Sequence, residues 1–288
     1  MTKAQSHTLT TDNAMLVSQK ISRWSPTKTD RQAGDDLATL KKAQSDAGKY
    51  IKNLVSRNEF KPVRRAYNDL RTDHYKRTLA WNDEGLRLLG GAHFREYTDS
   101  QHELQLIYKK AADDFANNEY ALARENAIIR LGELFRSDDY PEPSELVLMF
   151  TVEHKFLPIP TADDFRVSLP NGDADEIKKQ IMADTQAMQA QATREAWERL
   201  HKVVQHMVDR LSETDAVFRN SLLGNVQETV DLLPALNIFG DPELDKMAEQ
   251  VKAKLLQADV DELRFDPVTR TSVAMDAKEL ASKMSAYL

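Results

Sequence analysis

Cysteine is absent from the 288 residues of this chain, and glycine and proline are scarce, with 9 and 10 copies. Without cysteine there is no disulfide, no thiolate metal site and no cysteine nucleophile. The shortage of glycine and proline argues against a β-sandwich or barrel, which needs many turns, and favours a few long helices. The sequence therefore predicts a mainly α protein.

Long apolar runs are also missing. No stretch approaches the roughly 18 apolar residues of a membrane span, and the first residues lack the apolar centre of a signal peptide. We therefore expect a cytoplasmic protein that has no membrane partner.

The familiar catalytic motifs do not occur. There is no Walker A loop, no Gly-x-Gly-x-x-Gly and no Gly-x-Ser-x-Gly, which argues against an NTPase, a dinucleotide-binding enzyme and an α/β-hydrolase. We expect no catalytic residue and no cofactor, although an enzyme with a site assembled from dispersed residues stays an alternative. The net charge of -7, from 39 basic and 46 acidic residues, disfavours non-specific coating of nucleic acid but allows a local basic patch.

The N-terminal part mixes extended and helical patterns. Residues 1–13 are rich in serine and threonine without periodicity, which predicts a flexible tail. Residues 14–24 roughly alternate between apolar and polar side chains, which predicts a strand. Extended pieces at residues 85–89 and 151–169 are expected to join this strand in a minor β-hairpin or small sheet.

Two helices are expected between these extended pieces. Thr29 or Asp30 can cap the first helix, whose apolar stripe is expected to run from Leu37 to Leu54. The second helix is expected over residues 62–78, because proline suits the first helical position.

Two long helices are predicted at residues 99–135 and 173–213. The second contains no glycine or proline, and at about 1.5 Å per residue it spans roughly 60 Å, against about 40 Å for a compact domain of this size. We expect an elongated helical bundle in which these helices pack antiparallel, as in a coiled coil, or in which the second helix protrudes against a partner. The apolar residues of the first helix recur at heptad-like steps, at Leu104, Tyr108, Ala111, Phe115, Leu122 and Ile129.

The expected elements form one mainly helical domain of residues 14–288. The sequence leaves open a division into an N-terminal α/β part, residues 14–98, and a long-helix part, residues 99–288. Three shorter helices are expected at residues 215–233, 242–257 and 272–287.

The helix at residues 62–78 carries the strongest basic cluster. Arg64, Arg71 and Tyr75 share its polar face, and Arg65 lies beside them. Arginines contact phosphates and tyrosine stacks on bases, so this helix is a candidate nucleic-acid site. A solvated face that pairs with acidic helices explains the same pattern, and we favour that interpretation.

Two other small groups of residues are candidates for a functional role. Trp81, in a turn beside Asp83, either anchors that turn to the core or marks a partner surface. Glu198 and His201 have the Glu-x-x-His spacing of di-metal helical bundles, but such a site needs two of these motifs. Only one is present, and a solvated ion pair explains it, so we expect no metal.

Four irregular segments resemble a known group of proteins. TLAWNDEGLRLL at residues 78–89, YPEPSELVLMF at 140–150, LPIPTADDFRVSL at 157–169 and LLPALN at 232–237 are similar to an uncharacterised family of helical phage and mobile-element proteins. Such proteins are often encoded near a MoxR-type AAA ATPase and a von Willebrand-type domain protein. The resemblance implies a helical fold and residence in the host cytoplasm, and it carries no catalytic residue over to this chain.

These observations predict a non-enzymatic phage or mobile-element accessory protein that acts through protein–protein interaction. The expected partner is a protein, such as an AAA ATPase or a host factor, and a homo-oligomer is expected as well. A nucleic-acid-binding protein that uses the basic helix is the first alternative, and an enzyme with a dispersed site is the second.

Overall fold

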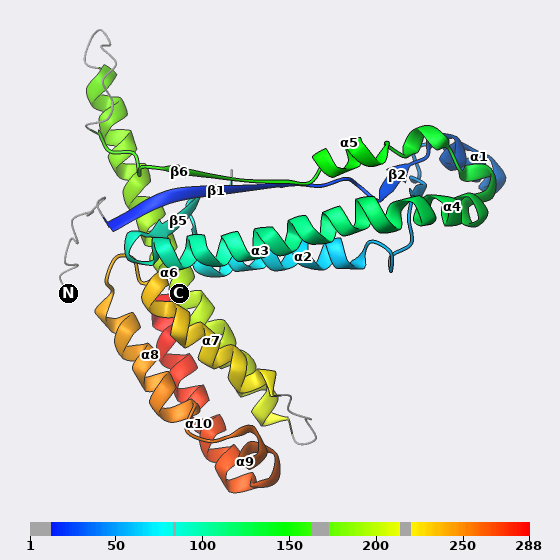
Figure 1. Ribbon diagram of the computed structural model, residues 1–288. Helices are drawn as coiled ribbons and strands as arrows, with labels where there is room; N and C mark the ends of the chain where they lie inside the picture. The colour runs from blue at the N-terminus through cyan, green and yellow to red at the C-terminus, as the bar shows by residue number, and fades with distance from the viewer. Residues whose placement is uncertain (1–12, 83–84, 163–172, 214–219) are drawn as a thin grey trace. The chain divides into compact units, whose positions relative to one another are not determined.

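A computed structural model describes residues 13–82, 85–162, 173–213 and 220–288 of the chain (Figure 1). Over these residues the protein is mainly helical, with a four-stranded antiparallel sheet and a separate two-stranded hairpin. None of the described helices is long and apolar enough to cross a lipid bilayer. The main elements, in chain order, are β1 Ala14–Ser22, β2 Thr27–Thr29, α1 Arg31–Lys41, β3 Ile51–Asn53, α2 Lys61–Arg77, β4 Leu79–Ala80, β5 Arg87–Gly90, α3 Phe94–Asp114, the π-turn η3 Phe115–Glu119, α4 Tyr120–Leu131, α5 Pro143–Leu148, β6 Thr151–Leu157, α6 Asp173–Ser212, α7 Ser221–Leu236, α8 Pro242–Leu255, α9 Val260–Phe265 and α10 Pro267–Met284.

The chain divides into two compact units that are interleaved in sequence. The first unit contains residues up to Ser18, Tyr75–Tyr97 and Lys155–Leu288, and the second contains Gln19–His74 and Thr98–His154. The chain passes from one unit to the other four times. The domains expected from the sequence, residues 14–288 or the pair 14–98 and 99–288, are consecutive stretches and do not have this arrangement.

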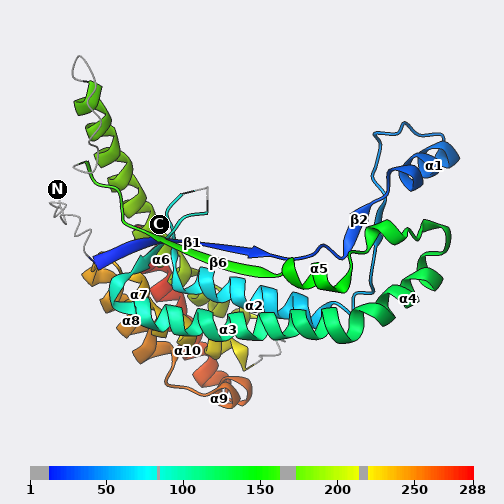
Figure 2. The same cartoon turned by 45° about the horizontal axis from the view of Figure 1, so that its top comes forward.

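The first unit is built on the second half of α6. This half packs against α7 and α10, and α8 packs against both of those helices, around a core of mostly Leu, Val, Ala and Met side chains (Figure 1 and Figure 2). The whole of α6 is continuous, as its lack of glycine and proline predicts. Between Asp173 and Gln191, a stretch that the structure describes in full, Thr185 is the one buried residue. About half of the helix therefore lies outside the core.

The sheet has the strand order β4-β5-β1-β6. Strand β1 pairs antiparallel with β5, with Leu16 opposite Leu88, and β5 pairs with β4, with Leu88 opposite Leu79. Leu16, Leu79 and Leu88 are all buried in the core of the first unit. The predicted association of residues 14–24, 85–89 and the start of 151–169 in a small sheet is confirmed, whereas residues 163–169 lie outside the described part of the chain.

The second unit has an aromatic core. The Trp24 ring lies 5.9 Å from that of Phe60 and 5.7 Å from that of Tyr120, in edge-to-face arrangements between ring centroids. Phe60 and Phe115 are a further edge-to-face pair at 5.1 Å, and such pairs stabilise a core beyond the area they bury. Helices α2, α3 and α4 supply much of this core, together with the chain around Tyr140.

The first expected helix is shorter than predicted. Helix α1 ends at Lys41, because Lys42 adopts a left-handed conformation with φ 53° and its N–H closes the helix onto Ala38 and Thr39. The chain then returns through a loop to β3, so the stripe predicted from Leu37 to Leu54 is not one helical face. Asp30 does cap this helix, through a 3.1 Å hydrogen bond from the Ala33 N–H.

The predicted heptad register holds to Phe115 and is wrong after it. Residues Phe115–Glu119 form a π-turn, which accommodates one extra residue in the helix. The buried positions therefore move on by one, to Tyr120, Ala123 and Ala127. Leu122 and Ile129, predicted to lie in the core, are instead exposed.

The predicted packing of the two long helices against each other is not confirmed. The buried side chains of α6 belong to one core, and those of α3 and α4 belong to another, with no residue in common among those described. Each long helix thus has its own apolar partners.

Candidate interaction surfaces

Helix α4 presents an apolar face to solvent in the second unit. The side chains of Leu122, Ile128 and Ile129 are 61%, 51% and 87% exposed. With Glu125 they recur at helical spacing of three or four residues, so they form one continuous stripe. The π-turn creates this surface, because it rotates these residues away from the aromatic core.

Polar contacts fix the orientation of α4. Arg130 donates hydrogen bonds to the carbonyls of Asn53 and Leu54, at 2.8 and 3.1 Å. The Asn126 amide donates to Glu59 Oε1 at 3.1 Å. Burial alone would raise the pKa of Glu59, but hydrogen bonds from Ser56 and Asn126 lower it. A charged Glu59 and Arg130 therefore hold α4 with its apolar stripe outward.

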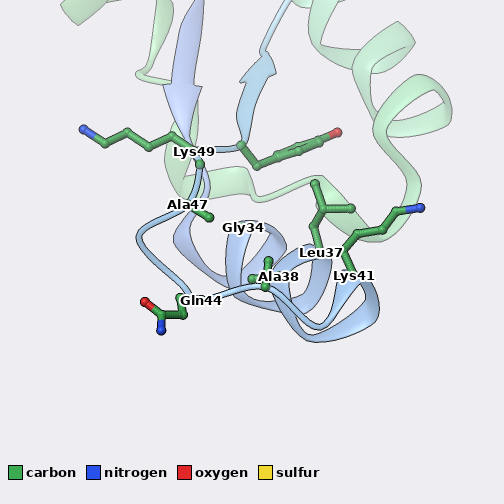
Figure 3. A pocket seen from close by; sticks show the side chains of 10 residues that line it. Gly34, Leu37, Ala38, Lys41, Gln44, Ala47 and Lys49 are labelled. Atoms are coloured by element: carbon green, nitrogen blue, oxygen red, sulfur yellow. The ribbon is translucent and has the colours of Figure 1, made fainter.

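A second surface lies beside α1. One face of this helix and the loop that follows it enclose a pocket of about 230 Å³ (Figure 3). In the close-up, Leu37 and Ala38 project from α1, and the side chains of Lys41 and Lys49 extend to opposite sides. The pocket is lined by Gly34, Leu37, Ala38, Lys41, Ala43, Gln44, Ala47, Gly48, Lys49 and Tyr50.

An ion network holds the base of α1. The side chain of Lys52 is 3% exposed, and its Nζ lies 2.8 Å from Asp30 Oδ2, 2.8 Å from Asp139 Oδ2 and 2.9 Å from the Leu134 carbonyl. Burial alone would lower the pKa of Lys52, but the bonds to Asp139 and Asp30 raise it. Since Asp30 also caps α1, this network ties the start of the helix to β3 and to the chain after α4.

A buried polar cluster lies elsewhere in the second unit. The Gln19 amide donates to Gln101 Oε1 at 2.6 Å, and His154 Nε2 lies 3.2 Å from both side chains. Gln101 donates in turn to Asp73 Oδ2 at 2.8 Å, and the His74 ring lies 6.5 Å from the His154 ring. Burial lowers the pKa of His154. Gln19, Gln101, Asp73 and His154 are linked by these hydrogen bonds, so we assign the cluster a structural role.

The predicted basic residues lie on α2. Arg64, Arg65 and Arg71 are exposed, and Arg65 Nε is 3.7 Å from Asp69 Oδ2. Tyr75 is partly exposed, but the Arg87 guanidinium lies 4.4 Å from its ring centroid and covers one face. The tyrosine is therefore already in a cation–π contact within its own unit, and it is a poorer stacking platform than the sequence suggested.

Trp81 proves to be an anchor of its turn. Its side chain is 4% exposed and belongs to the core of the first unit, so it is not a partner surface. Asp83, its predicted neighbour on that surface, lies outside the described residues.

Glu198 and His201 lie on α6. The Glu198 carboxylate pairs with Arg194, four residues earlier in the helix, at 3.1 Å. Among the described residues, no group of three or more histidines and carboxylates is placed to hold a metal ion. Glu198 therefore forms a solvated ion pair, which is the interpretation that the sequence favoured over metal binding.

The α4 stripe was missed because the heptad count assigned its residues to the core. A signal was present: Asn117 and Asn118 are adjacent residues of low helix propensity, and they fall inside the π-turn. Two such residues in a long helix indicate a place where the hydrophobic register can change.

The chain matched none of the protein-family models, curated proteins or solved structures with which it was compared.

Proposed function

We propose that this chain is a non-enzymatic protein that binds a protein partner through the exposed stripe of α4. The observation that carries this proposal is the exposure of Leu122, Ile128 and Ile129 on one rigid helix. Water contact with such large apolar side chains costs about 25 cal/mol per Å² of apolar area, so covering them stabilises a complex.

The spacing of the stripe favours a helical occupant. Leu122 and Ile129 are seven residues apart and Glu125 lies between them, the pattern that a partner helix meets along one seam. Arg124 lies beside the stripe, and an amphipathic helix with a carboxylate beside its apolar face complements it. We therefore propose an amphipathic helix of another protein as the occupant.

The biological setting is a second part of the proposal and rests on the sequence resemblance. A phage or mobile-element accessory protein, with an AAA ATPase or a host factor as partner, agrees with the absence of a recognisable catalytic motif. Nucleic-acid binding by α2 is the competing function, and its test is given in the Discussion.

Site-specific cross-linking tests the α4 surface. A photo-reactive amino acid at position 129 is expected to capture a protein whose cross-linked peptide is an amphipathic helix. The purified partner should then bind Leu122→Ser/Ile129→Ser at least about tenfold more weakly than wild type, because two large apolar contacts are lost.

Leu106→Ser is the matched control, since Leu106 is also an exposed leucine on a helix of the same unit. Equal weakening by the control would show that the stripe is not the binding surface. If the cross-linked peptide comes from a second copy of this chain, and light scattering gives a mass of a multiple of 32.8 kDa, the occupant is the chain itself and the proposed partner is wrong.

A further inference from the structure

Helix α1 is unusual within the second unit because none of its 11 residues is buried. A helix this short is marginally stable in water by itself, so it needs support. Its support comes from its ends, through the Asp30 cap, the Lys52 network and the left-handed residue Lys42. None of its apolar residues is buried, so its apolar face stays partly in contact with water.

That face is one wall of the pocket in Figure 3. Gly34, Leu37, Ala38 and Lys41 recur at helical spacing along α1 and all line the pocket. Leu37 is 47% exposed, so the wall is only half covered by the protein itself. A volume of about 230 Å³ is below the roughly 300–1,000 Å³ typical of small-molecule sites, and it suits a single large side chain.

The charges around the pocket have one sign. Lys41 and Lys49 line it, and no carboxylate does. Lys41 and Lys49 are both exposed, and in Figure 3 their side chains extend to opposite sides, so each ammonium group can meet its own carboxylate on either side of an apolar side chain. A polyphosphate chain fits less well, because it has no apolar group to place against the Leu37, Ala38 and Ala47 side chains of the lining.

We infer that this pocket binds a short acidic peptide segment of a partner protein, which inserts one apolar side chain beside Leu37 and places carboxylates against Lys41 and Lys49. The site is separate from the α4 stripe and has different chemistry, so it does not depend on the function proposed for that stripe. Binding of the peptide covers the apolar face of α1, which the protein itself leaves partly exposed.

A glycine provides a way to obstruct the pocket without damaging the fold. A Cβ atom added at Gly48 meets nothing within 4 Å, and the backbone there does not require glycine. Gly48→Leu therefore places a side chain at the pocket wall without a clash at its Cβ. This variant should retain the thermal stability of the wild type.

The test uses the full chain and a fluorescent peptide in which glutamates flank a single leucine. We expect binding to wild type that weakens at least about tenfold in Lys41→Glu/Lys49→Glu and in Gly48→Leu. Lys61→Glu/Lys110→Glu, which reverses two exposed lysines elsewhere in the same unit, should bind like wild type. Leu122→Ser/Ile129→Ser should also bind like wild type, which separates this site from the α4 stripe.

Two altered peptides test the stated chemistry. Replacing the leucine by serine, or all glutamates by glutamines, should each abolish most of the binding. The inference is overturned if wild type does not bind the acidic peptide, if the glutamine peptide binds equally well, or if the control pair of lysines weakens binding as much as the pocket pair. It is also overturned if a single-stranded oligonucleotide binds the pocket more tightly than the peptide does.

Discussion

The two compact units stabilise different kinds of structure with different side chains. The first unit packs helices around a core of mainly aliphatic residues, with Leu200, Leu244 and Leu280 inaccessible to solvent. The core of the second unit is instead rich in aromatic rings. Aliphatic side chains pack helix against helix by shape alone, whereas aromatic side chains can also carry a polar group into the core.

Three tyrosines of the second unit donate hydrogen bonds from their hydroxyl groups to backbone carbonyls. Tyr108 donates its hydroxyl to the Ser22 carbonyl at 2.7 Å, and Tyr120 donates to the Pro141 carbonyl at 2.9 Å. Tyr140 donates to the Leu54 carbonyl at 2.7 Å. Ser22 is the last residue of β1, and Leu54 and Pro141 lie outside the helices and strands, so each bond fixes a strand end or a connecting segment against the core.

The largest expected effect is on the core of the first unit. Leu200→Asp should reduce the free energy of unfolding by several kcal/mol, since it places a charge without a partner in an aliphatic core. Met188→Asp, on the same helix at a partly buried position, should cost clearly less. Hydrogen exchange should show lost protection in α7, α8 and α10.

The same experiment tests whether the cores are separate. Because the two cores share no described residue, amides of α2 and α3 in the second unit should keep most of their protection in Leu200→Asp. Equal loss of protection in both units would show that they unfold together. The two units would then differ in the composition of their cores but not in their stability.

A smaller effect is expected on the second unit at alkaline pH. Burial raises the pKa of Tyr108 and of Tyr120 to about 12, against 10.0 for a free phenol. Between these values the unfolded chain loses protons that the folded protein retains. Stability is therefore complete below about pH 10 and falls as the pH rises toward 12, by about 2 kcal/mol for each tyrosine.

Tyr108→Phe separates this effect from general alkaline unfolding. At neutral pH the variant should lose about 1 kcal/mol, because the Ser22 carbonyl loses its donor. Between about pH 10 and 12 its stability should decline less steeply than that of the wild type, as measured by urea unfolding. Parallel curves for the two proteins would mean that this tyrosine does not contribute to the alkaline loss.

The sequence was informative where periodicity is long and uninterrupted. Helix α6 was expected at residues 173–213 and is found at Asp173–Ser212, because no residue in it opposes a helix. Helix α9 was missed, although Asp259 and Glu262 form a capping box that is readable in the sequence. Helix α8 begins at Pro242 as predicted, whereas α10 begins at Pro267, five residues before its predicted start at 272.

The candidate surfaces could not be predicted in the same way, because both depend on a local break in a helix. The α4 stripe exists because one extra residue in a π-turn moves Leu122 and Ile129 out of the core. The α1 pocket exists because the chain turns back at Lys42 with a positive φ. Lysine rarely adopts that conformation, so its identity gives no warning of the turn.

The smallest expected effect concerns the basic face of α2, the part of the second unit that the aromatic core leaves in solvent. Replacing Arg64, Arg65 and Arg71 by alanine should change the free energy of unfolding by no more than about 1 kcal/mol per residue, since exposed ion pairs such as Arg65–Asp69 contribute little. The wild type should show no micromolar affinity for DNA or RNA at about 150 mM salt, because the net charge of -7 opposes association.

If the wild type instead gives a gel shift that weakens steeply with salt, and the triple variant abolishes it, these arginines neutralise phosphates and α2 becomes the functional surface. The salt slope would then flatten by up to about three, one for each lost phosphate contact. A shift that persists in the triple variant would place nucleic-acid binding elsewhere on the chain and leave α2 as a solvated face.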